Sequence, residues 1–118
     1  MTDLEAALAW CPFPDRDAAR SAANQLLDEK LIACANILPG IESIFEWQGE
    51  STSAQEVAVV FKTTGSILGA LIARLGDIHP YDTPAILGWR CDSAHPETLK
   101  WLDKTLTNGR VDRGVDAG

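Results

Sequence analysis

The feature that most limits how this chain can fold is a strand-like stretch from residue 31 to 48. A Pro-Gly pair at residues 39 and 40 interrupts it, and the missing donor and permissive backbone there predict a bulge or bend. Beyond the bend, apolar Ile41, Phe45 and Trp47 fall on one face and alternate with polar residues. We therefore expect one buried face and one solvent-exposed face. About 18 residues of strand would extend roughly 50 Å at ~3.3 Å per residue, farther than one small domain. We therefore expect a hairpin that overhangs its own sheet and pairs with other copies of the chain.

The rest of the chain predicts alternating strands and helices. The first strand is expected to end at a Pro-Phe-Pro run, because proline lacks the donor that a sheet needs, and Asp15 is the expected N-cap of the first helix. Apolar spacing of three and four residues predicts the helices. The expected segments are a strand over 4–11, a helix after Asp15, the long strand, a turn over 49–54, a return strand over 55–63, a helix over 66–78, a strand over 84–91 and a helix from Pro96 to Leu106.

This order of elements predicts an α+β fold. Strand, helix, strand, strand, helix, strand is the ferredoxin-like βαββαβ sandwich, here with an extra C-terminal helix and a long hairpin between the second and third strands. Right-handed crossovers leave few other topologies. We expect one domain over residues 1–107 and a flexible glycine-containing tail over 108–118.

Charge and composition limit the class of partner. Ten Lys and Arg against 17 Asp and Glu give a net charge of −7, which disfavours nucleic acid because phosphate binding needs a basic patch. The first residues lack a basic leader, and no uncharged stretch approaches the roughly 20 residues of a membrane span, so we expect a cytoplasmic protein without a membrane partner. Three well-separated cysteines predict free thiols.

Four stretches together carry a resemblance to a known family. They are Glu29–Gly40 (EKLIACANILPG), Ser43–Glu50 (SIFEWQGE), Glu56–Thr64 (EVAVVFKTT) and His79–Pro84 (HPYDTP). In order and spacing they resemble the CutA family of divalent-cation tolerance proteins. The resemblance implies a homotrimer whose hairpins complete sheets across subunits, a role in tolerance to copper and other divalent metals, and no enzymatic reaction.

The resemblance also implies candidate metal ligands. Cys11 is the counterpart of a cysteine tied to copper binding in some members, and a thiolate with the His79 imidazole would suit copper. Ala85 and Ile78 stand where some members carry a glutamate and a second histidine. Two ligands make a weak site, and His79 could instead hydrogen-bond backbone.

A second set of residues matches the family near a cleft between subunits. These are Trp47, Glu56, Lys62 and Tyr81. Their other interpretation is interface packing for the two aromatic residues and an ion pair for the two charged ones.

Other classes of function find less support in the sequence. Neither histidine lies near a nucleophile elbow, so we do not expect an enzyme. The loop after the first strand lacks the two cysteines of a metallochaperone, and Phe61-Lys62 is a thin match to an RNA-binding sheet. The alternative left open is a PII-like small-ligand sensor or interaction scaffold that works through the intersubunit cleft.

Overall fold

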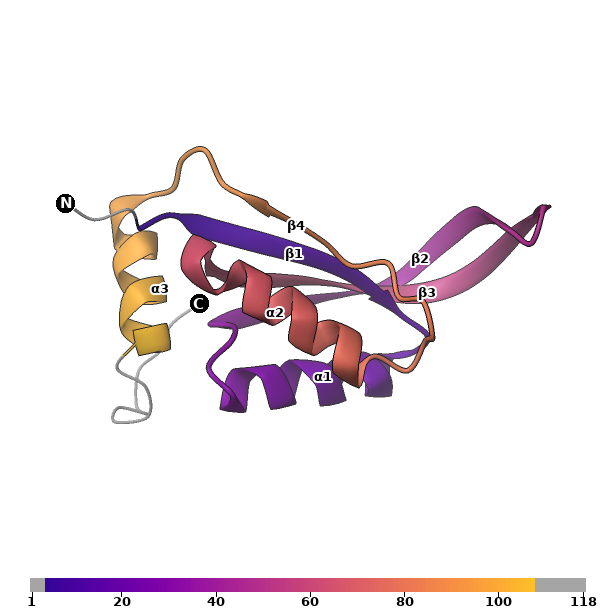
Figure 1. Ribbon diagram of the computed structural model, residues 1–118, viewed down its shortest axis with the longest axis horizontal. Coiled ribbons are helices and arrows are strands. Elements are labelled where there is room, and N and C mark those ends of the chain that lie inside the picture. Colours follow the sequence, from indigo (N-terminus) through magenta and orange to yellow (C-terminus); the bar gives the residue numbers. More distant parts are fainter. Residues whose placement is uncertain (1–3, 108–118) are drawn as a thin grey trace.

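The computed structural model describes residues 4 to 107 and has the expected ferredoxin-like architecture (Figure 1). Its single antiparallel sheet has the strand order β2-β3-β1-β4. The strands are β1 (Ala6–Phe13), β2 (Cys34–Trp47), β3 (Glu50–Thr64) and β4 (Leu87–Arg90), and the helices are α1 (Arg16–Asp28), α2 (Gly65–Ile78) and α3 (Pro96–Thr107). The predicted tail over 108–118 lies outside the described residues.

Helices α1 and α2 cover one face of the sheet (Figure 1). The core between them and the sheet contains Phe13, Leu26, Phe61, Leu71 and Leu75, all without exposed surface. The alanine-rich face of α1 buries small side chains there, which lets the helix axis approach the sheet closely. Helix α3 buries Leu102 and Leu106 at one end of the sandwich. Within residues 4 to 107, no helix combines the length and hydropathy that crossing a bilayer requires.

The first strand continues through Pro12, so the prediction that it stops at Cys11 was wrong. Pro12 pairs with Ala58 across the sheet, and the strand ends at Phe13. The amide of Cys91 donates to the carbonyl of Ala6, so the backbone groups of even-numbered residues in β1 face the β4 side. Strand β4 pairs only with residues 7–10, and Pro12 therefore lies at an open edge, where its missing donor breaks no ladder bond.

The hairpin is longer on its return side than the sequence predicted. The expected turn over 49–54 is wrong, because Trp47 already pairs with Glu50 and only Gln48 and Gly49 form the loop. Both have positive φ, 52° and 83°, as a two-residue type I′ turn requires. Strand β3 therefore begins at Glu50 and β2 spans 14 residues.

The predicted bulge at Pro39-Gly40 is confirmed. Three steps along β2, from Leu38 to Ile41, match two steps along β3, from Ala58 to Glu56, and Gly40 has φ 79°. The one extra residue places Leu38 and Ile41 on the same face of the sheet although their numbers differ in parity.

The distal hairpin is not covered within one chain, contrary to the expected buried side. Phe45 and Trp47 are 41% and 55% exposed, and Ile44 on the opposite face is 73% exposed. The hairpin extends beyond the helices, and the described chain is 49 Å long but only 28 and 23 Å in its other dimensions (Figure 1). The overhang predicted from strand length is therefore present, and the described chain leaves its apolar side chains uncovered.

Helix α1 ends in a Schellman motif. The amide of Leu31 donates to the Leu26 carbonyl and that of Lys30 to the Leu27 carbonyl, at 3.0 and 3.1 Å. Lys30 occupies the left-handed position with φ 63°, which glycine usually takes.

Candidate functional site

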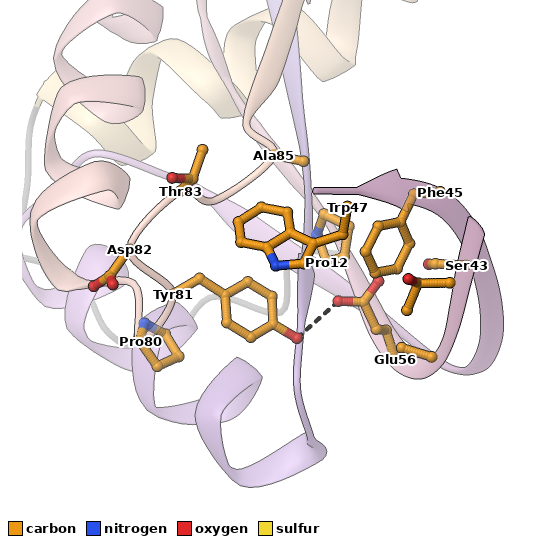
Figure 2. A pocket seen from close by; sticks show the side chains of 12 residues that line it. Pro12, Ser43, Phe45, Trp47, Glu56, Pro80, Tyr81, Asp82, Thr83 and Ala85 are labelled. Atoms are coloured by element: carbon orange, nitrogen blue, oxygen red, sulfur yellow. Dashed lines mark hydrogen bonds between the residues drawn. The ribbon is translucent and has the colours of Figure 1, made fainter. Parts of the chain in front are cut away.

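A groove opens between the distal half of the hairpin and the irregular segment that joins α2 to β4 (Figure 2). Predicted as strand from residue 84, this segment is irregular until Leu87, and the structure corrects that boundary. The groove has a volume of about 770 Å³, within the usual range for small-molecule sites. Its lining residues are Pro12, Ser43, Phe45, Trp47, Thr52, Ala54, Glu56, Pro80, Tyr81, Asp82, Thr83 and Ala85.

Tyr81 joins the two walls of the groove. Its hydroxyl donates to the Glu56 carboxylate at 2.8 Å, across 25 positions of sequence (Figure 2). Partial burial, followed by the hydrogen bond to Glu56 and the charge of that carboxylate, raises the pKa of Tyr81 to about 12. The phenol therefore stays protonated at neutral pH and remains a donor to Glu56.

His79 fixes the backbone from which Tyr81 projects. Its Nδ1 accepts from the Tyr81 amide at 3.1 Å, and its Nε2 lies 2.8 Å from the Pro12 carbonyl oxygen. Because the Pro12 oxygen can only accept, Nε2 carries a proton. Because Nδ1 accepts from the Tyr81 amide, it carries none, and the ring in this arrangement is the Nε2-protonated tautomer. The ring also stacks on Phe13 with centroids 4.5 Å apart. His79 thus ties the end of α2 to the open edge of β1.

Cys11 lies beneath this arrangement with no exposed surface. Its thiol faces the same Pro12 carbonyl, with Sγ 3.6 Å from the oxygen. Burial, with a smaller contribution from the negative charge of Glu56, raises the pKa of Cys11 to about 12. Binding of a metal by this sulfur would require loss of its proton, which burial makes harder.

The structure brings the two predicted copper ligands to one oxygen atom, but their side-chain atoms already have hydrogen-bond partners. Cys11 and His79 converge on the Pro12 oxygen, and both ring nitrogens of His79 already have partners. Across residues 4–107, no three His, Cys, Asp or Glu side chains gather as a metal cluster would need. In this arrangement the two residues do not fit a copper ion, and their role as ligands stays a prediction.

Three of the four predicted cleft residues share the groove. Trp47, Glu56 and Tyr81 all line it, and Figure 2 shows the Trp47 indole and the Tyr81 ring facing the same space. Lys62 does not line the groove. It lies six residues from Glu56 along β3, where it pairs with Leu8 and Cys34 in the middle of the sheet. Whether the groove is a ligand cleft or a subunit interface stays a prediction.

Sequence reasoning missed Phe45 and Asp82 as groove residues. The alternation in the sequence does place Phe45 on the same strand face as Trp47, so extending the set of cleft residues along that face would have included it. Nothing comparable points to Asp82, because the segment from Pro80 to Ile86 has no periodicity. Ala85, which replaces a candidate ligand, lines the groove with a methyl group, and Ile78 packs against the core.

Comparison with known proteins gives one consistent family. The family model described as CutA1 divalent ion tolerance protein matches residues 7–105. The divalent-cation tolerance protein CutA of Salmonella newport (strain SL254) is 39% identical over 102 residues, which are 86% of this chain and 89% of that protein. The chloroplastic protein CutA of Arabidopsis thaliana is 37% identical over 101 residues, 86% of this chain but only 56% of that longer protein. A crystal structure of the divalent ion tolerance protein CutA1 from Ehrlichia chaffeensis superposes with a TM-score of 0.83 at 33% identity, over 87% of this chain and 96% of that one.

Proposed function

The chain belongs to the CutA1 family of divalent ion tolerance proteins, and we propose that it acts in tolerance to copper and other divalent cations as a cytoplasmic, non-enzymatic homotrimer. The observation that carries the proposal is the family match over residues 7–105, nearly all of the described domain. Relatives of similar length carry the name divalent-cation tolerance protein, and they align with 86% of this chain.

The uncovered sheet supports the homotrimer. Helices cover one face only, and the other presents Leu87 and Trp89 of β4 at 66% and 46% exposure. Phe45 and Trp47 extend the same kind of surface along the hairpin, and β2 is an edge strand of 14 residues. Long apolar edges of this sort are normally covered by another chain. A closed ring of three copies would cover the edge and the face of each.

Copper growth assays test the role in tolerance. The chain is expressed in a bacterial strain that lacks its own CutA protein, and growth is followed on rising copper concentrations. We expect the wild-type chain to restore the copper concentration that halves growth, and Trp47→Ala to restore less of it because assembly is weakened. The matched control is Trp101→Ala on α3, away from the hairpin. No gain in tolerance from a well-expressed wild-type chain would reject the proposed role.

Calorimetry tests direct copper binding separately. Copper is titrated into the reduced protein and into Cys11→Ser and His79→Ala. Because the geometry ties up both residues, metal would have to displace the Pro12 or Tyr81 contacts, and we expect weak binding that both variants weaken further. Binding that is unchanged in both variants would remove Cys11 and His79 as ligands.

A further inference from the structure

We propose that Glu56 in the groove of one copy pairs with Lys62 on the sheet face of the next copy, so that a neighbouring chain completes the groove. The inference rests on the homotrimer proposed above and names the contact that joins its subunits. Three observations carry it: a cation without a carboxylate, a carboxylate without a cation, and the length of strand that separates the two within one chain.

Lys62 is a cation without a partner on a surface that assembly would cover. It alternates with buried Phe61 along β3, so its side chain lies on the face of the sheet that the helices leave open. Its neighbours on that face are Leu8 and Cys34 across the sheet and Val60 along the strand. The ion pairs among residues 4 to 107 use three other cations: Arg74, Arg90 and Lys100. Covering this face without supplying a carboxylate would bury an unpaired charge, which is costly.

The groove has the opposite imbalance. Glu56 and Asp82 are the carboxylates of its lining, and the described residues that line it include no Lys, Arg or His. Glu56 accepts from the Tyr81 hydroxyl at 2.8 Å through one oxygen, and its other oxygen can accept from a second donor (Figure 2). A neighbouring chain that covers Phe45 and Trp47 would also cover this carboxylate, and a cation from that chain would compensate its charge.

Glu56 and Lys62 cannot pair with each other within one chain. They lie six residues apart on β3, which is about 20 Å at ~3.3 Å per residue, whereas an ion pair needs nitrogen and oxygen within about 4 Å. The even spacing places both on the same face of the sheet. A second copy can therefore satisfy both by a head-to-tail contact, in which the groove of each copy meets the Lys62 region of the next. Contacts of this kind close into a ring when the rotation permits, and each of three copies would use both surfaces once.

The surroundings of the two charges are complementary as well. Phe45 and Trp47 supply apolar surface at the groove. Beside Lys62, Leu8 pairs with Trp89 in the same row of the sheet, and Trp89 is 46% exposed within one chain. Apolar surface on both sides supplies the contact area, and the ion pair sets the register, because a shifted contact would leave both charges buried and unpaired.

Charge reversal tests the pair. The variants are Lys62→Glu, Glu56→Lys and the double reversal. The assembled mass is followed by light scattering over a dilution series, in a fixed concentration of urea that leaves the wild-type chain folded. We expect each single reversal to raise the concentration at which half of the chains are assembled by at least about tenfold, since like charges then face each other. The double reversal restores opposite charges across the contact, and we expect it to recover most of that loss.

A matched control carries the same charges on the opposite face. Lys62→Glu combined with Glu42→Lys has the same net charge as the double reversal. Glu42 pairs with Gln55, next to the pair of Ile41 with Glu56, and therefore points to the other side of the sheet. We expect this control to assemble no better than Lys62→Glu alone.

A neutral pair of variants removes the charges without disturbing Tyr81. Glu56→Gln keeps an oxygen that can accept from the Tyr81 hydroxyl, and Lys62→Met keeps an unbranched side chain of similar length. Each single change leaves one charge buried without its partner, so we expect the double variant to lose less assembly than the sum of the two single losses. Far-UV circular dichroism checks that every variant compared is folded.

Two results would overturn the inference. One is a double reversal that assembles no better than the control with Glu42, and the other is a neutral pair whose two losses simply add. With an assembled wild-type chain, either result would reject the ion pair and leave the homotrimer standing. A monomeric wild-type mass would reject the homotrimer and the ion pair together, while the copper growth assay tests the role in tolerance separately.

Discussion

Replacing His79 by alanine should destabilise the fold in metal-free solution. The imidazole is 8% exposed and makes four contacts: the bond to the Pro12 carbonyl, the bond from the Tyr81 amide, the stack on Phe13 and a tilted ring contact with Tyr81 at 4.9 Å. Alanine loses all four and leaves two backbone groups at a poorly hydrated site. The effect needs no bound metal, which separates a structural role from ligation.

The contacts give the magnitude. Each hydrogen bond contributes about 0.5–1.5 kcal/mol, and a ring stack adds about 0.5–1.5 kcal/mol. We therefore expect the free energy of unfolding to fall by about 2–4 kcal/mol. The second histidine provides the control: His95 is exposed and its Nδ1 accepts only from the Glu97 amide at 3.0 Å, so His95→Ala should cost less than about 1 kcal/mol.

Urea unfolding of both variants with excess chelator measures this difference. Protomer concentration is held constant, because assembly contributes to apparent stability. The reasoning fails if His79→Ala loses no more than His95→Ala, or if the loss is seen only when copper is present.

Three further predictions concern the hairpin, the end of α1 and the buried thiol. Trp47→Ala should shift the mass measured by light scattering toward monomer and lower the melting temperature, and an unchanged mass and melting point would count against the hairpin as an assembly element. Lys30→Gly should raise the free energy of unfolding by about 1 kcal/mol in urea titrations, since it relieves the left-handed backbone at φ 63°, and a loss would refute that account. Iodoacetamide at pH 8 should label Cys34 and Cys91 well before Cys11 by mass spectrometry. Since the folded pKa of Cys11 is raised from 9.0 to about 12, its contribution to stability is complete below pH 9 and lost between pH 9 and 12, and equal labelling of all three thiols would contradict its burial.

Much of the fold follows from periodicity alone. The alternation in β3 that buries Val57, Val59 and Phe61, and the helical spacing of α2, are local signals that tertiary packing reinforces. The tip of the hairpin was not predictable in this way. The run Glu50–Ser53 is polar and typical of a turn, and it becomes strand only because residues 44–47 of β2 supply its hydrogen-bond partners.

The candidate site depends on contacts that sequence spacing cannot give. Glu56 and Lys62 do share a strand face, as their spacing predicts, but only Glu56 reaches the groove. Tyr81 meets Glu56 because His79 directs the loop after α2, and that direction depends on the Pro12 carbonyl 67 positions earlier. Long-range constraints of this kind leave no local pattern in the chain.

The bulge at Pro39-Gly40 determines which side chains of the distal hairpin lie on each face of the sheet. If β2 paired one-to-one with β3 from Leu38 onward, with no bulge to take up the extra residue, Ile41 would lie opposite Gln55 instead of Glu56, and strict alternation would turn Phe45 and Trp47 to the helix side of the sheet. The ladder could form with nearly the same number of bonds, yet the aromatic wall opposite Tyr81 would be gone. The groove therefore depends on the backbone conformation at the bulge as well as on the identity of its side chains, although the bulge contributes no residue to its lining.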